Sequence, residues 1–172
     1  NLEKIFVARE PLVGEILVRL GQWRPSASRQ HYLLIGPRGI GKTCVLQVIA
    51  HRIRRDSLLS RTWVPVALPE EGYGLNSVAD LFVHALGLLA EETADRDVGD
   101  RHQQVRLDPD DRRALDLTLD AFRRFHARTG KCVLLMLENV NRVLDRQLGP
   151  RSQRHLLRKI LIEEEWLAAI CT

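Results

Sequence analysis

The stretch HYLLIGPRGIGKTCVLQVIA, residues 31–50, decides the fold that this sequence predicts. It indicates a short apolar strand over residues 32–35, a glycine-rich loop, GPRGIGKT, over residues 36–43, and an apolar helix that begins at Lys42. A strand, a G-x-x-x-x-G-K-T loop and a helix in this order are typical of a Walker A phosphate-binding loop. The alternative, a glycine-rich turn with a structural role alone, does not account for the flanking strand and helix.

The residue types of this loop suit the chemistry of a polyphosphate. Glycines at positions 36, 39 and 41 let the backbone fold back on itself, so that consecutive N–H groups and a helix N-terminus point at the phosphates. Lys42 offers a positive charge to the β- and γ-phosphates, and the hydroxyl of Thr43 is a ligand for Mg²⁺. We therefore expect a nucleotide to bind along the loop and the first helical turn, which consist of Gly36, Pro37, Arg38, Gly39, Ile40, Gly41, Lys42, Thr43 and Cys44.

Length and composition predict a single domain over residues 1–172, because the chain is long enough for one well-packed core and too short for two. No apolar run approaches the length that crosses a membrane, so we expect no membrane contact. Three widely spaced cysteines and the lack of a signal-peptide pattern favour the cytoplasm and predict neither a disulfide nor a metal cluster. Because the first residue is Asn1 and not methionine, we expect a piece of a longer protein.

The chain is mildly basic, with a formal net charge of +4 and a pI near 9.3. Arginines cluster around residues 52–55, 112–124 and 151–158, which suggests a nucleic-acid surface as one interpretation. Acidic residues are interleaved along the chain, so solvated helix faces are the preferred interpretation of these clusters.

Strand and helix patterns alternate along the chain. Apolar runs predict strands over residues 32–35, 63–68, 133–137 and 166–172. Apolar residues at helical spacing predict helices over residues 11–20, 42–55, 78–89, 109–129, 142–148 and 152–163. This alternation predicts a parallel, doubly wound, three-layer α/β/α sheet of the P-loop NTPase kind.

Details of the pattern predict where some elements lie and end. Pro65 within its strand predicts an edge position, since proline cannot donate to a ladder, and the run from Val133 to Leu137 predicts a central strand. Asn76 or Ser77 is expected to cap the helix that follows. Residues 91–108 are charged and poor in large apolar side chains, which predicts an exposed or mobile loop.

The second half of the site is expected at Glu138, which ends the predicted central strand. An acid at the end of such a strand faces Mg²⁺ in P-loop enzymes, usually as aspartate followed by a glutamate base. This chain has Glu138 and then Asn139, and an amide cannot take a proton. Slow hydrolysis stays open because an amide can orient the attacking water. Two alternatives also stay open: Glu138 is itself the base, or it is only a polar strand end.

With these residues in view, the chain resembles the AAA+ ATPases, in the branch shared by origin-recognition-type ATPases and the signal-transduction ATPases with numerous domains (STAND). Four stretches carry the resemblance over nearly the whole chain, in the order FVARE at 6–10, GPRGIGKT at 36–43, LLMLEN at 134–139 and WLAAICT at 166–172. They are similar to the branch's entry motif, its Walker A loop, a variant Walker B strand and its sensor 1 strand.

The resemblance implies ATP or ADP with Mg²⁺ as the cofactor, and Phe6, Val7 and Arg9 beside the adenine, with Ala8 in place of the family's glycine. It implies that Thr172 lies at the sensor 1 position and helps Lys42, Glu138 and Asn139 in catalysis. The family's fifth strand, arginine finger and helical lid would follow residue 172, so the domain is expected to be incomplete at its C-terminus. Its implied partners are its own lid, effector and sensor domains and a second copy of itself.

Three hypotheses for the function remain. The leading one is a slowly hydrolysing nucleotide switch in the STAND manner within a larger regulatory ATPase. The second is a DNA-binding initiator or loader ATPase, which should show salt-sensitive DNA binding. The third is a nucleotide-binding scaffold that never hydrolyses, which the Glu138-Asn139 pair motivates.

Overall fold

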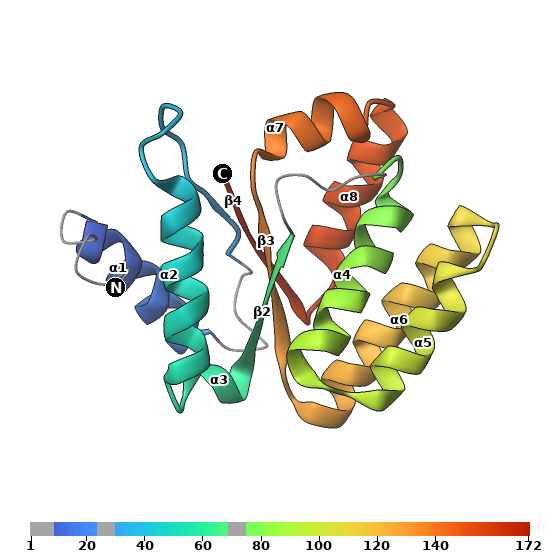
Figure 1. Ribbon diagram of the computed structural model, residues 1–172, viewed down its shortest axis with the longest axis horizontal. Coiled ribbons are helices and arrows are strands. Elements are labelled where there is room, and N and C mark those ends of the chain that lie inside the picture. The colour runs from blue at the N-terminus through green and yellow to red at the C-terminus, as the bar shows by residue number, and fades with distance from the viewer. Residues whose placement is uncertain (1–8, 24–29, 69–74) are drawn as a thin grey trace.

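Four parallel strands form one sheet in the computed structural model, which describes residues 9–23, 30–68 and 75–172 (Figure 1). The strands are β1 (Tyr32–Leu33), β2 (Trp63–Leu68), β3 (Cys132–Leu137) and β4 (Leu167–Cys171). Their order across the sheet is β1-β4-β3-β2, and every neighbouring pair is parallel. The predicted α/β fold class is confirmed.

Strand β3 lies inside the sheet between β4 and β2, and all six of its residues are buried. Its last residue, Leu137, pairs with Leu68 on one side and with Cys171 on the other. The residues that follow β3 and β4 therefore meet at the carboxyl edge of the sheet. In open parallel sheets ligands bind at this edge.

Helices cover both faces of the sheet, as expected for a doubly wound fold (Figure 1). On one face lie α1 (Glu10–Gln22), α2 (Lys42–Arg55) and the short α3 (Leu59–Thr62). On the other lie α4 (Val78–Thr93), α5 (Arg96–Arg106), α6 (Asp111–Thr129) and α8 (Arg151–Glu163). Between β3 and α8 the chain forms α7 (Val140–Arg142) and the π-helical turn η3 (Val143–Gln147).

The two faces of the sheet make two separate cores. Leu134 and Met136 of β3 pack among the residues of α1 and α2, whereas Val133 and Leu135 pack among those of α4, α6 and α8. Successive residues of a strand point to opposite faces, and a strand that is covered on both faces must be apolar throughout. This is why residues 133–137 are a continuous apolar run.

Several local predictions are confirmed. Strand β2 is at an edge of the sheet, as Pro65 required. Ser77 is the residue that caps α4, where its Oγ accepts a hydrogen bond of 3.1 Å from the N–H of Asp80. Helix α6 ends at Gly130, whose φ of 69° is the left-handed conformation that favours glycine.

The prediction of an exposed or mobile loop over residues 91–108 is wrong. Helix α4 continues to Thr93, and residues 96–106 form α5, which begins where Asp95 Oδ1 accepts a hydrogen bond of 3.2 Å from the N–H of Val98. Val98 and Val105 are buried and lie seven residues apart, two helical turns. Helix α5 packs against the rest of the protein through few apolar side chains, so its composition resembles that of a loop. This explains why the sequence predicted a loop here.

The other boundaries differ from prediction by a few residues. Strand β1 covers Tyr32–Leu33 and not 32–35, although the N–H of Leu34 still donates to the carbonyl of Cys171 over 2.8 Å. The side chain of Leu33 in this strand is 58% exposed, and that of Ile35, which follows the strand, is 88% exposed. In the described residues, no helix is long and apolar enough to cross a membrane.

Candidate nucleotide-binding site

The glycine-rich loop joins β1 to α2 at the carboxyl edge of the sheet. Gly39 has a φ of 80° and Gly41 a φ of 89°, values that L side chains rarely adopt. These two conformations turn the chain back so that α2 can begin at Lys42 directly behind the loop. The glycines are therefore required by the backbone path of the loop.

The N-terminus of α2 is open toward the loop. The first helical hydrogen bond runs from the N–H of Val45 to the carbonyl of Gly41 over 3.1 Å, and no side chain among the described residues caps this end. The N–H groups of the first turn thus have no partner within the helix. Together with the positive end of the helix dipole they favour an anion at this place.

The side chain of Lys42 folds back over the loop. Its ammonium group donates to the carbonyl of Gly36 over 2.8 Å and to the carbonyl of Pro37 over 3.1 Å. These bonds hold the positive charge against the first residues of the glycine-rich loop. An ammonium group can donate three hydrogen bonds, so one remains for a phosphate oxygen.

Thr43 and Glu138 bring the two halves of the site together. The hydroxyl of Thr43, in the first turn of α2, donates a hydrogen bond of 2.9 Å to Oε2 of Glu138, which directly follows β3. A hydroxyl and a carboxylate are the oxygen ligands that Mg²⁺ accepts, and Mg²⁺ is commonly held by only one or two carboxylates together with phosphate oxygens. The residues present therefore fit a nucleotide with its magnesium ion.

Asn139 and Thr172 are joined at the same edge. The N–H of Asn139 donates to Oγ1 of Thr172 over 3.2 Å, and the N–H of Val140 donates to the carbonyl of Thr172 over 2.8 Å. Asn139 has a φ of 49°, a left-handed conformation in which asparagine is among the better tolerated residues. The structure thus places the ends of β3 and β4 side by side next to Glu138.

A protein-family model described as "AAA ATPase domain" matches residues 5–165. This chain is an AAA ATPase domain. No curated protein matches the chain, and neither does any solved structure. Membership of the family supports nucleotide binding.

Of the three residues of this AAA ATPase domain that are expected beside the adenine, the structure describes one. Phe6 and Val7 lie outside the described residues. Arg9 immediately precedes α1 and, in the described part of the chain, makes no hydrogen bond or ion pair to residues 36–43. Its neighbour Glu10 instead pairs with both terminal nitrogens of Arg52, at 2.6 and 2.8 Å, in the last turn of α2.

One neighbour of the site was not expected from the sequence. A hollow of about 320 Å³ beside Glu138 lies between α2 and the ends of β2 and β3, and Gln47 and Arg54 line it. Gln47 is four residues after Thr43 and so lies on the same side of α2. The four-residue spacing between Thr43 and Gln47 is the signal in the sequence that could have predicted Gln47 near the site.

Cys171, the last residue of β4, adjoins Thr172 at the carboxyl edge of the sheet. Burial raises the pKa of the Cys171 thiol to about 11, so this group next to Thr172 stays neutral at physiological pH. Among the described residues, no cluster of three or more histidine, cysteine, aspartate or glutamate side chains could hold a metal ion.

Proposed function

We propose that this AAA ATPase domain binds ATP or ADP with Mg²⁺ and acts as a nucleotide-dependent switch within a larger regulatory protein, in the manner of the STAND ATPases. The observation that carries the proposal is the 2.9 Å hydrogen bond between Thr43 and Glu138 beside an uncapped helix N-terminus. It joins the two expected magnesium ligands, which come from different elements of the fold.

Each residue of the loop has a distinct part in this proposal. The N–H groups at residues 38–44 bind the α- and β-phosphates, and Lys42 binds the β- and γ-phosphates. Thr43 and Glu138 hold Mg²⁺, directly or through a bound water. The bound metal neutralises charge on the phosphates, and the protein keeps the γ-phosphate in line with an attacking water.

Hydrolysis in this proposal is slow. Asn139 occupies the position after Glu138, where a carboxylate would serve as base, and it can orient a water but cannot accept its proton. The hydroxyl of Thr172 accepts the N–H of Asn139 and keeps its own proton for a water or a phosphate oxygen. Such a domain stays in its ATP state for a long time, which suits a switch.

Further parts of the same protein complete the switch in this proposal. Strand β1 is at an edge of the sheet that the described residues form, which supports the addition of a strand there from elsewhere in the protein. A helical lid, effector and sensor domains, and contact with a second copy are the other proposed partners.

A second candidate function, a DNA-bound initiator or loader ATPase, is favoured by one observation. The solvent-facing side of α8 has four exposed basic residues, and its single acid lies at the end of the helix; the basic residues are Arg151, Arg154, Arg158 and Lys159. Binding of the full-length protein to duplex DNA that weakens steeply with salt would support this candidate.

Single-turnover hydrolysis of ATP by the full-length protein tests the proposal. We expect slow, Mg²⁺-dependent turnover in the wild type and none above background in Lys42→Ala, because that substitution removes the positive charge that binds the phosphates. Lys159→Ala, a surface lysine of α8, is the matched control and should behave as the wild type. Tight binding without any turnover would instead favour a non-hydrolysing scaffold, and unchanged nucleotide affinity in Lys42→Ala would contradict the site itself.

A further inference from the structure

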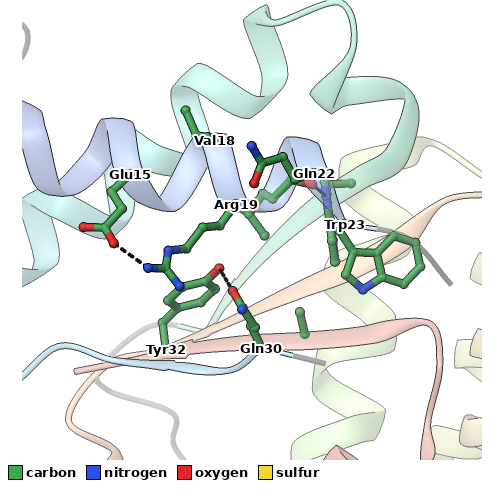
Figure 2. Close-up of a pocket in the computed structure, with 10 residues that line it drawn as sticks. Glu15, Val18, Arg19, Gln22, Trp23, Gln30 and Tyr32 are labelled. Atoms are coloured by element: carbon green, nitrogen blue, oxygen red, sulfur yellow. Dashed lines mark hydrogen bonds and ion pairs between the residues drawn. The ribbon is translucent and has the colours of Figure 1, made fainter. Parts of the chain in front are cut away.

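A second hollow lies at the amino edge of the sheet, at the opposite end of the strands from the phosphate-binding loop (Figure 2). It has a volume of about 420 Å³ and lies between the C-terminal half of α1 and the beginnings of β1, β2 and β4. Its lining comes from ten residues: Glu15, Val18, Arg19, Leu20, Gln22, Trp23, Gln30, Tyr32, Trp63 and Ala168. Small-molecule sites in proteins have volumes of about 300–1,000 Å³, so the hollow is large enough for one.

The inner part of the hollow is aromatic and fixed in place. Trp63 is only 2% exposed, and its indole N–H donates to the carbonyl of Leu20 over 3.1 Å. Trp23 meets Trp63 edge to face, with ring centroids 5.3 Å apart and an angle of 66° between the rings. Tyr32 provides a third ring. Rigid aromatic walls of this kind favour a flat aromatic occupant.

The outer part of the hollow is polar and has no net charge. Arg19 and Glu15 face each other one turn apart on α1 with a 2.7 Å ion pair, as Figure 2 shows. The hydroxyl of Tyr32 donates to Oε1 of Gln30 over 3.1 Å, and Gln22 supplies a further amide. Burial raises the pKa of Tyr32, so its hydroxyl is a neutral donor. Because the two charges cancel, this rim suits an occupant that has both donors and acceptors but no net charge.

We propose that this hollow is a second ligand site, which takes a small aromatic molecule that is neutral or zwitterionic and has both hydrogen-bond donors and acceptors. The ring lies against Trp23 and Tyr32, and the polar groups meet Arg19, Glu15 and the two glutamines at the rim. None of the lining residues belongs to the glycine-rich loop at residues 36–43, so the hollow is separate from the proposed nucleotide site.

Calorimetric titration and ligand-observed NMR of the full-length protein, without nucleotide, test this site with three probes. L-Tryptophan has the ring and both polar groups, L-leucine has the polar groups without an aromatic ring, and indole has the ring without the amino and carboxylate groups. We expect L-tryptophan to bind, indole to bind more weakly and L-leucine not to bind. The proposal would be overturned if neither L-tryptophan nor indole binds, or if L-leucine binds with the same affinity as L-tryptophan.

Surface substitutions then locate the binding. Arg19→Ala should weaken L-tryptophan roughly tenfold, because a charge-assisted hydrogen bond is lost. The matched control is Arg124→Ala, which removes an arginine from another exposed one-turn ion pair, with Asp120 on α6, also of 2.7 Å. Val18 lines the mouth and is 58% exposed, so Val18→Trp should block entry without unfolding the domain. Binding that survives both Arg19→Ala and Val18→Trp would place the ligand elsewhere and overturn the proposal.

Discussion

Thr43 donates a hydrogen bond of 2.9 Å to Glu138, although 95 positions separate the two residues in the sequence. One lies in the first turn of α2 and the other directly follows β3. The contact depends on the order of strands in the sheet, which leaves only β4 between β1 and β3. It therefore ties the magnesium part of the proposed site to the fold as a whole.

The first prediction concerns Mg²⁺. Glu138→Gln should weaken ATP affinity about tenfold when Mg²⁺ is present, because it removes the charge that faces the metal. With EDTA the same substitution should have little effect, since Lys42 and the loop N–H groups still bind the phosphates. Fluorescent-nucleotide titration in the two buffers measures this, with Glu163→Gln on the surface of α8 as control. An equal loss in both buffers would argue against a metal role for Glu138.

The second prediction concerns the base. Asn139→Glu should speed single-turnover hydrolysis about tenfold or more, because a carboxylate would then stand where the attacking water must lose its proton. ATP affinity should change little. If Glu138 is itself the base, Asn139→Glu will leave the rate unchanged, and Glu138→Gln will abolish turnover instead. Quench-flow measurement on both variants separates the two assignments.

The third prediction concerns α5 and its cap. Partial burial of Asp95 opposes its ionisation, but hydrogen bonds from Arg128 and from the N–H of Val98 outweigh this and lower its pKa. A carboxyl whose pKa is lower in the folded state stabilises the fold above its ordinary pKa, and this contribution is lost as the pH falls through the folded value. Asp95→Ala should thus lower the free energy of unfolding by about 1 kcal/mol at pH 7 and by less near pH 3.

Urea unfolding at the two pH values checks this prediction. The control is Asp100→Ala, an exposed position within the same helix, which should change stability by less than about 0.5 kcal/mol. Hydrogen exchange provides a second test, since the amides of residues 100–106 should be protected in a helix. Rapid exchange there, together with an unchanged stability of Asp95→Ala, would restore the interpretation of this segment as a loop.

The fourth prediction concerns the core between α6 and the sheet. Phe122 is 1% exposed; its ring stacks on Trp166 with centroids 4.6 Å apart and meets Phe82 edge to face at 6.3 Å. Phe122→Ala should lower the free energy of unfolding by about 3–5 kcal/mol, because it leaves a cavity that these rings cannot fill. Leu117→Ala, at a half-exposed position of the same helix, should cost less than half as much in the same urea titration.

The sequence predicted the local features of this fold well. The loop at residues 36–43, the edge position of β2, the cap at Ser77 and the end of α6 at Gly130 each depend on the conformation or hydrogen-bonding capacity of one or a few residues. The continuous apolar run of β3 likewise reports its own burial. Such signals act within a few residues, so they can be read without knowledge of the rest of the chain.

The tertiary structure decided the features that depend on distant partners. Helix α5 looked like a loop because its stability comes from Val98 and Val105 against α4 and α6 and from the ion pair of Asp95 with Arg128, 33 positions away.

By itself the sequence determined the glycine-rich loop at residues 36–43, the alternation of strands and helices, and the acid at Glu138 that follows the central strand. Only the tertiary structure decided that Thr43 is hydrogen-bonded to Glu138 and Asn139 to Thr172, and that Trp23, Tyr32 and Trp63 line one hollow. The reason is physical: backbone conformation and capping are set by neighbours in sequence, whereas strand order and packing are set by the burial of apolar surface over the whole chain.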